Sequence, residues 1–241
     1  MARTVVVLGA RNLGGAIVDH FGERGWNVAA VARSDETLER VAARGARALR
    51  ADASDPAALS SALAQAREES GALDAVVNAV GASRPPSGGP FGGGPLADAS
   101  LEAFRGWAVA VAEQCFVFLS TGAAALRAAG GGGGALIQVT GGSSRRAMPG
   151  KGAWAAGAFA SRALVQAAAQ ELRAEGIHVA LLAVDATIES PKTAGYTRDQ
   201  PREALADMAE VARAVGFLVE QGVRGMTHEL VVTPAGDRWV P

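Results

Sequence analysis

Short apolar runs alternate with longer helix-like segments along the chain, and this alternation constrains the fold more than any other feature. Short apolar runs are typical of buried strands, and the longer segments between them are typical of helices. The predicted strands are Val5–Leu8, Val28–Val31, Ala46–Leu49, Ala75–Asn78, Leu136–Val139, Val179–Val184 and Glu229–Val232. The predicted helices are Gly14–Arg24, Asp35–Arg44, Asp55–Glu69, Leu101–Ala129, Ala153–Glu175 and Ala204–Glu220. Because such alternation builds right-handed βαβ units, we predict an α/β fold with a single doubly wound parallel sheet and helices on both faces.

Two glycine-rich segments interrupt this pattern without dividing it. Ser83–Pro95 is rich in glycine and proline, and Gly130–Gly134 is a run of glycines. Such composition buries too little apolar surface to order itself, so we expect flexible surface loops. The first loop is also a candidate for a mobile rim beside a pocket. The alternation continues across both segments, so we expect residues 1–241 to form one domain.

The composition argues against several classes of function. The 23 basic and 24 acidic residues give a net charge of −1, whereas nucleic-acid and anionic-membrane surfaces need a basic excess. The lone Cys115 rules out a disulfide framework within the chain and a paired-cysteine metal site. The three histidines show no metal-ligand spacing, so we expect no metal.

The sequence shows no clear membrane span or signal peptide. The most apolar long stretch, Trp107–Leu126, is interrupted by Glu113 and Gln114. The first apolar run, Val5–Leu8, is too short for the core of a signal peptide and meets Gly9 at once. We therefore expect a cytoplasmic protein.

A glycine-containing turn follows the first predicted strand. The segment GARNLGGAIV spans Gly9–Val18 and leads directly into the first predicted helix. Glycines at such a turn let the backbone approach a pyrophosphate, and the helix presents its free N–H groups and positive dipole end to the anion. The segment therefore predicts a dinucleotide site; a tight turn without a ligand is the alternative.

Two arginines bear on the identity of the dinucleotide. The second predicted strand ends near Arg33, where an acidic residue would bind the ribose 2′-hydroxyl of NAD and an arginine accommodates the 2′-phosphate of NADP. Together with Arg11 in the glycine turn, Arg33 favours NADP(H) over NAD(H). The alternative is that both are ordinary solvated arginines.

These motifs resemble those of the short-chain dehydrogenase/reductase family along nearly the whole chain. Gly9 and Gly15 match the first and third glycines of the family's TGxxxGxG turn, with Leu13 at the second. Asp52 resembles the aspartate that contacts adenine, the segment from Asn78 to Gly81 resembles the family's NNAG, and the segment Met226–Val232 resembles its C-terminal signature. The resemblance implies a Rossmann-type NAD(P) site formed by Gly9, Arg11, Asn12, Leu13, Gly15, Arg33, Asp52, Ala53, Asn78, Gly81 and Ile188.

The residues that do the chemistry in this family have no match. The family uses a serine after the fifth strand and YxxxK on the next helix, where the lysine charge lowers the tyrosine pKa from about 10. Aligned without a gap, these positions hold Gly141, Trp154 and Ala158. An indole N–H does not exchange a proton near neutral pH, so the family's usual proton transfer cannot operate here.

Other side chains are candidates to replace the missing groups. Ser143 lies just beyond the serine position, next to Ser144, and Tyr196 lies in the loop where the family covers its substrate. Glu189, like Asp185, would act as an acid or base if burial raised its pKa. The competing interpretation of each is structural: a loop serine, a packed tyrosine, a capping or solvated carboxylate. For Lys151, three residues before Trp154, the competing interpretation is a surface lysine.

Three functions remain open at this point. The first is an oxidoreductase that works without the usual triad on a small molecule such as an iminium ion or an activated alkene. The second is a nucleotide-binding sensor or inactive partner subunit, and the third is a cyclase or isomerase that reuses the pocket. The resemblance also implies a homodimer or homotetramer formed through the helices Leu101–Ala129 and Ala153–Glu175.

Overall fold

The computed structural model describes residues 2–81 and 89–237, and its elements follow the predicted alternation. The strands are β1 (Thr4–Leu8), β2 (Asn27–Ala32), β3 (Arg47–Arg50), β4 (Ala75–Asn78), β5 (Gly134–Gly141), β6 (Ile177–Val184), β7 (Thr187–Ile188), β8 (Leu205–Ala206) and β9 (Glu229–Val232). The helices are α1 (Leu13–Glu23), α2 (Asp35–Ala43), α3 (Pro56–Ser70), α4 (Leu101–Phe104), α5 (Ala110–Ala129), α6 (Gly152–Leu172), α7 (Ala194–Thr197) and α8 (Met208–Val219).

Seven strands form one parallel sheet in the order β3-β2-β1-β4-β5-β6-β9. The chain builds outward from β1 to β3 and then returns to place β4 on the other side of β1. At such a reversal, doubly wound sheets bind ligands in a crevice outside the carboxyl ends of the two strands, which are β1 and β4 here. The predicted fold class is confirmed.

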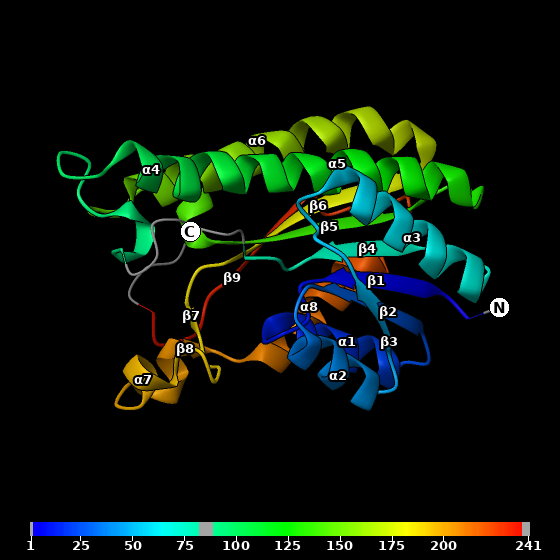
Figure 1. The fold of residues 1–241 in the computed structure, drawn as a ribbon, viewed down its shortest axis with the longest axis horizontal. Coiled ribbons are helices and arrows are strands. Elements are labelled where there is room, and N and C mark those ends of the chain that lie inside the picture. Colours follow the sequence, from blue (N-terminus) through cyan, green and yellow to red (C-terminus); the bar gives the residue numbers. More distant parts are fainter. Residues whose placement is uncertain (1, 82–88, 238–241) are drawn as a thin grey trace.

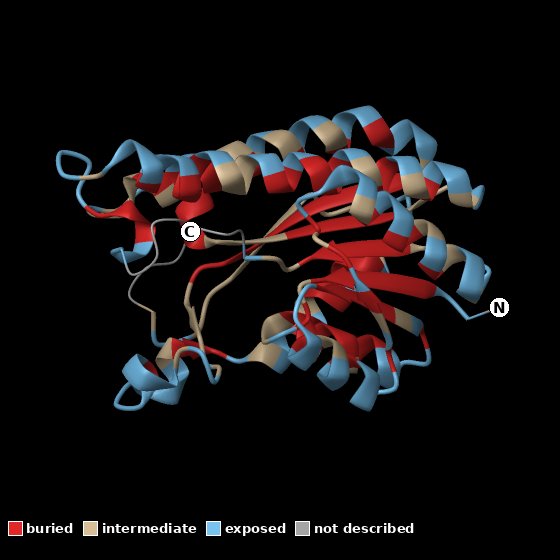
Figure 2. Ribbon diagram, viewed as in Figure 1, coloured by how far each residue is buried: buried red, intermediate tan, exposed pale blue. Residues whose placement is uncertain are grey.

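Helices cover both faces of the sheet. One buried core lies between the sheet and α3, α5 and α6, and the other lies between the sheet and α1, α2 and α8 (Figure 1). The central strands β1, β4 and β6 are buried over their whole length, while the outer helix surfaces are exposed (Figure 2). Helices on both faces explain why β1 and β6 consist almost entirely of apolar residues, without a polar alternation.

A small lobe, β7–α7–β8, differs from the sequence prediction. We expected one helix over Ala204–Glu220, but α8 begins at Met208, and the preceding residues pair with β7 as the short parallel strand β8. The reason is the Asp207 cap, whose side chain accepts hydrogen bonds from the N–H groups of Ala209 and Glu210 and so fixes where the helix begins. The lobe lies beyond the carboxyl ends of the main strands (Figure 1).

The two glycine-rich segments behave differently. Residues 82–88 of the first lie outside the described residues, but Phe91–Gly93 forms a turn in which Gly92 and Gly93 are buried. The expectation of a loose surface loop is therefore wrong for this part. In the second segment, Gly130 ends α5 in the left-handed conformation, and the following residues form a surface turn into β5, as predicted.

The continuous helical stretch Leu101–Ala129 is the one described helix long and apolar enough to cross a membrane. Of its most apolar part, 44% is buried inside the structure, where Cys115, Phe118 and Leu126 face the sheet. One such helix is weak evidence for a membrane span, because core helices of globular proteins pass the same test of length and composition.

Candidate functional site

The turn between β1 and α1 requires glycine at two positions. Gly9 has φ +83°, and a Cβ there would lie 3.0 Å from the Cα of Val80, two residues after β4. A Cβ on Gly14 would lie 1.9 Å from the carbonyl oxygen of Gly9. Gly15 is less constrained, since the nearest atom to its Cβ would be the carbonyl oxygen of Ala10 at 3.2 Å. The family spacing predicts Gly15 as the site glycine, but Gly14 is the one that the turn requires. In the sequence, the only indication of this is that two glycines stand side by side.

The first turn of α1 faces the crevice without a side-chain cap. Asn12 occupies the N-cap position, but its side chain accepts no hydrogen bond there, and Leu13 begins the helix. The carbonyl oxygen of Asn12 accepts from the N–H groups of Gly15 and Ala16. The uncapped N–H groups and the helix dipole favour an anion at this end of α1. Arg11, which is exposed, stands beside it.

Two predicted site residues, Arg33 and Asp52, form an ion pair at the ends of β2 and β3. Nη1 of Arg33 lies 3.3 Å from Oδ2 of Asp52, while Oδ1 of Asp52 accepts the backbone N–H of Ser54 at 2.9 Å. The Ser54 N–H, and secondly the Arg33 charge, lower the pKa of the Asp52 carboxyl. The Arg33 side chain is largely exposed and that of Asp52 is partly exposed, whereas the neighbouring Ala53 is buried. Exposed pairs of this kind are weak, so the Arg33 guanidinium can exchange partners.

Asn78 is buried beneath the crevice. Its Nδ2 donates to Oε1 of Gln114 at 2.8 Å and to Oε1 of Gln138 at 2.7 Å, and the side chain is fully buried. This amide network ties the end of β4 to β5 and α5. The Asn78 side chain therefore supports the crevice from below, and the accessible part of this segment is the backbone near Gly81, which is exposed.

The three positions aligned with the family's serine, tyrosine and lysine lie together at the carboxyl end of β5. A Cβ on Gly141 would lie 3.6 Å from Cζ2 of Trp154, an ordinary van der Waals contact. Ala158 follows Trp154 by one helical turn and is buried. The indole of Trp154 also contacts the rings of Phe91 and Trp107.

A carboxylate lies beside Gly141. Asp185 directly follows β6, and a Cβ on the neighbouring Gly142 would lie 1.8 Å from its Oδ1. The Asp185 carboxylate is buried and accepts from Nη2 of Arg146 at 3.2 and 3.3 Å. A buried carboxylate needs such a partner, and only glycine at 142 leaves room for it.

The serine candidates lie in the turn after β5. Ser144 is fully buried, and its Oγ donates to the carbonyl oxygen of Gly141 at 2.9 Å. Ser143 is also buried, with 9% of its surface exposed. The Ser144 hydroxyl thus stabilises the turn, as expected of a loop serine with a structural role.

The remaining candidates lie in the small lobe. Glu189 forms an ion pair with Arg202 at 3.6 Å and helps to line a hollow of about 640 Å³. The carbonyl oxygen of Ile188 accepts from Oγ1 of Thr193 at 2.7 Å. Tyr196 is 61% exposed, so it is not the packed tyrosine of the structural interpretation. The contacts of Glu189 and Tyr196 are thus within the lobe or with solvent.

The structure also shows the surroundings of the single cysteine and of two histidines. Cys115 is a buried apolar residue, as expected, and burial raises its pKa to about 12. His178 on β6 and His228, which directly precedes β9, are distant in sequence but lie with ring centroids 5.6 Å apart. Within residues 2–81 and 89–237, no group of three or more His, Cys, Asp or Glu side chains could hold a metal ion.

Solved structures of similar fold cover nearly the whole chain. An alcohol dehydrogenase from the archaeon Thermococcus sibiricus, complexed with 5-hydroxy-NADP, is 22% identical, with a TM-score of 0.80 and full coverage of both chains. A variant of actinorhodin polyketide ketoreductase with NADPH is 19% identical, with a TM-score of 0.82 over 99% of this chain and 98% of that one. Acetoin dehydrogenase from Enterobacter cloacae is 21% identical, with a TM-score of 0.78 over 100% and 99%.

Comparison of the amino-acid sequence with protein families identifies the family of this chain. No curated protein sequence matches the chain. A family model described as enoyl-(acyl carrier protein) reductase matches residues 7–236, nearly the full length. The chain therefore belongs to the short-chain dehydrogenase/reductase family.

Proposed function

We propose that the protein is an oxidoreductase that binds a nicotinamide dinucleotide and transfers hydride to or from a small organic molecule. The observation that carries this proposal is the turn at Gly9 and Gly14, where side chains are excluded, next to the uncapped N-terminus of α1. This turn fits a pyrophosphate, because the backbone can approach it closely and the helix end favours its charge. Similar structures that hold 5-hydroxy-NADP and NADPH support the same assignment.

The charges at the ends of β2 and β3 favour NADP(H) over NAD(H). Arg33 stands where NAD-selective proteins place an acidic side chain. The nearest following acid, Asp35, is paired with Arg50. Arg33, together with Arg11, would therefore meet the 2′-phosphate of NADP, with Arg33 leaving the weak pair with Asp52.

The proposed reaction does not use the family's proton relay. The bound nicotinamide would supply or accept the hydride. Gly141, Trp154 and Ala158 offer no hydroxyl and no ammonium group at the three usual positions. Trp154, packed against Phe91 and Trp107, would exclude water and orient the substrate. Substrates that accept hydride without prior protonation, such as iminium ions or activated alkenes, suit such a site.

The packing of Trp154 also favours a second candidate, a nucleotide-binding sensor or inactive partner subunit. The indole of Trp154 lies beside Gly141 and packs against the rings of Phe91 and Trp107, and Asp185 is paired with Arg146. In a sensor, the same crevice would bind NADP(H) and no substrate would turn over.

The first experiment is a fluorescence titration with NADPH and NADH. Binding of NADPH in the micromolar range, and weaker binding of NADH, supports both candidates. Failure of both nucleotides to bind below millimolar concentration would overturn both. Single-turnover oxidation of bound NADPH with a panel of imines, enones and ketones then separates the candidates. Turnover supports the oxidoreductase, and its absence throughout the panel leaves the sensor.

A restored site provides the internal control. The triple variant Gly141→Ser/Trp154→Tyr/Ala158→Lys introduces all three family residues at their usual positions. Ketone reduction gained only in this variant would mean that the wild-type scaffold binds the cofactor but lacks proton-transfer groups. Ala158 is buried, so a lysine there can prevent folding. If the triple variant fails to fold, the double variant Gly141→Ser/Trp154→Tyr is tested in its place.

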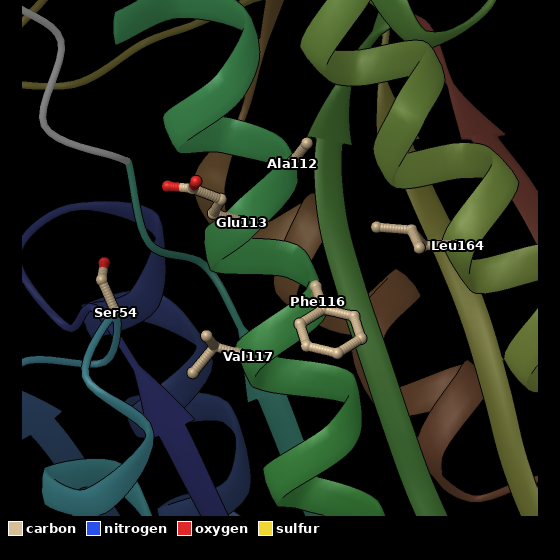
Figure 3. A pocket seen from close by; sticks show the side chains of 6 residues that line it. All are labelled: Ser54, Ala112, Glu113, Phe116, Val117 and Leu164. Atoms are coloured by element: carbon tan, nitrogen blue, oxygen red, sulfur yellow. The ribbon is translucent and has the colours of Figure 1, made fainter. Parts of the chain in front are cut away.

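We also propose that two or four copies assemble through α5 and α6. Phe116 on α5 and Phe159 on α6 are 59% and 41% exposed. Next to Phe116, a shallow hollow of about 450 Å³ is lined by Ser54, Ala112, Glu113, Val117 and Leu164 (Figure 3). Light scattering tests this proposal: a dimer or tetramer is expected, and Phe116→Glu should shift it to monomer. A monomeric wild-type protein would contradict it.

A further inference from the structure

Three aromatic rings from three separate segments meet at the carboxyl end of β5. The ring centroids of Phe91 and Trp107 lie 5.0 Å apart, those of Phe91 and Trp154 lie 4.9 Å apart, and those of Trp107 and Trp154 lie 5.2 Å apart. Phe91 comes from the turn after residue 89, Trp107 from the helical turn before α5, and Trp154 from the start of α6. We call these three residues the aromatic cluster. Aromatic clusters offer flat apolar surface for stacking.

The backbone holds Phe91 at the surface of this cluster. Gly92 and Gly93 have φ of +87° and +94°. A Cβ on Gly92 would lie 2.9 Å from the Cα of Lys151, and one on Gly93 would lie 3.0 Å from the Cβ of Ala153. The turn is thus pressed onto the start of α6, and only glycine permits this approach. Phe91 remains 58% exposed although two tryptophans lie against it.

The segment that contains Phe91 and Trp107 is also unusually rich in exposed apolar side chains. Between residues 89 and 109, five large hydrophobic side chains are exposed to water, which is half of those found in the described part of the chain. They are Phe91, Leu96, Leu101, Phe104 and Val109. Exposed apolar residues gathered in one segment, unlike scattered ones, indicate a binding surface.

A cation stands at the edge of the cluster. Nζ of Lys151 lies 5.6 Å from the centroid of the Phe91 ring. Within the described residues, no carboxylate lies within ion-pair distance of Lys151, and its side chain is half-buried. The other two basic side chains of this loop are paired, Arg145 with Glu229 and Arg146 with Asp185. A half-buried ammonium that faces an aromatic ring and lacks a carboxylate partner favours an incoming anion.

From this arrangement we infer that the aromatic cluster and Lys151 bind a planar, conjugated molecule that carries a carboxylate. Its flat part lies along Phe91 and Trp154, and its carboxylate accepts hydrogen bonds from Nζ of Lys151. Trp154 also reaches Gly141, so the ligand lies at the carboxyl end of β5, beside the crevice. The identification of this ligand as the substrate rests on the proposed function; its binding does not.

The test uses trans-cinnamate as the probe, with cinnamyl alcohol as the uncharged molecule of the same shape. Calorimetric titrations are made on the full-length protein, with and without NADP⁺. Cinnamate should bind at least about tenfold more tightly than the alcohol, since a charge-assisted hydrogen bond is worth about 1.5 kcal/mol or more. Lys151→Gln should remove this preference, and Phe91→Leu should weaken both probes about threefold or more.

The chain offers a matched control. Lys192 is the only other lysine, so Lys192→Gln removes the same charge elsewhere and should leave cinnamate binding unchanged. Equal binding of the two probes, no binding of either, or equal losses in Lys151→Gln and Lys192→Gln would each overturn the inference. Cinnamate binding that depends on Lys151 in a protein that fails to bind NADPH would support the site while overturning the proposed function.

Discussion

The two ends of the crevice differ in what their glycines accommodate. At β1, Gly9 and Gly14 have no side chains that would keep a ligand away from the backbone. The N-terminus of α1 has no side-chain cap, so its N–H groups can bind an anion. At β5, Gly142 instead makes room for a side chain of the protein itself, the carboxylate of Asp185. The first end fits a phosphate group, whereas the second is filled by Asp185 and by the indole of Trp154. Glycine in a sequence therefore indicates close approach, and only the structure says whether the approaching group is a ligand or another part of the chain.

The most damaging substitution is expected at the first end. Gly14→Ala places a Cβ 1.9 Å from the carbonyl oxygen of Gly9, so β1 and α1 must separate. We expect a loss of about 3 kcal/mol in the free energy of unfolding, together with loss of NADPH binding. Urea denaturation and the nucleotide titration measure these two effects.

Gly22 is the matched control in the same helix. A Cβ there meets nothing within 4 Å, so Gly22→Ala should stabilise the protein by about 0.5–1 kcal/mol. If both alanine variants behaved alike, the close approach at Gly14 would not matter.

At the second end, two adjacent glycines should respond differently. Gly142→Ala displaces the Asp185 carboxylate from Arg146 and should cost about 2 kcal/mol in urea denaturation. Gly141→Ala makes only an ordinary contact with Trp154 and should change stability by less than about 0.5 kcal/mol. The double variant Gly142→Ala/Asp185→Gly should regain part of the loss; a further loss would mean that Asp185 is not what fills the space.

Acid should lower the free energy of unfolding through two histidines on the sheet face that carries α1 and α8. His20 packs against Gly216 between these helices, and burial lowers its pKa below 6.5; burial also lowers the pKa of His178 on β6. The unfolded chain therefore takes up these protons at higher pH than the folded one. Stability should be constant above about pH 7 and fall as the pH drops below 6.5, toward the folded-state pKa values.

Urea midpoints measured between pH 8 and 5 show this effect. His20→Gln should reduce the decline, because glutamine does not titrate. A decline of the same size in this variant would assign the effect to other groups.

The smallest effect on stability is expected at Arg33. Its pair with Asp52 is exposed, so Arg33→Gln should change the free energy of unfolding by less than about 0.5 kcal/mol. The same variant should weaken NADPH binding about tenfold and leave NADH binding unchanged. Equal weakening of both nucleotides would mean that Arg33 does not contact the 2′-phosphate.

Much of this molecule follows from local sequence. The apolar runs, the helices between them and the position of the glycine turn are local properties, since they depend on side-chain period and backbone freedom. They sufficed to predict the parallel sheet and the end of the sheet at which the crevice lies. The late start of α8 at Met208 is also a local property, because Asp207 is an N-cap residue directly before it.

Long-range contacts decided the rest. Gly14, and not Gly15, must be glycine because the carbonyl oxygen of Gly9 points at it. Asn78 can be buried because Gln114 and Gln138, from other segments, accept its hydrogen bonds. Likewise, the partner of Gly142 is Asp185, 43 positions along the chain. The residues at the family's chemical positions can be read directly from the sequence. What fills the space around them cannot, because it depends on which distant side chains the packed sheet brings into contact.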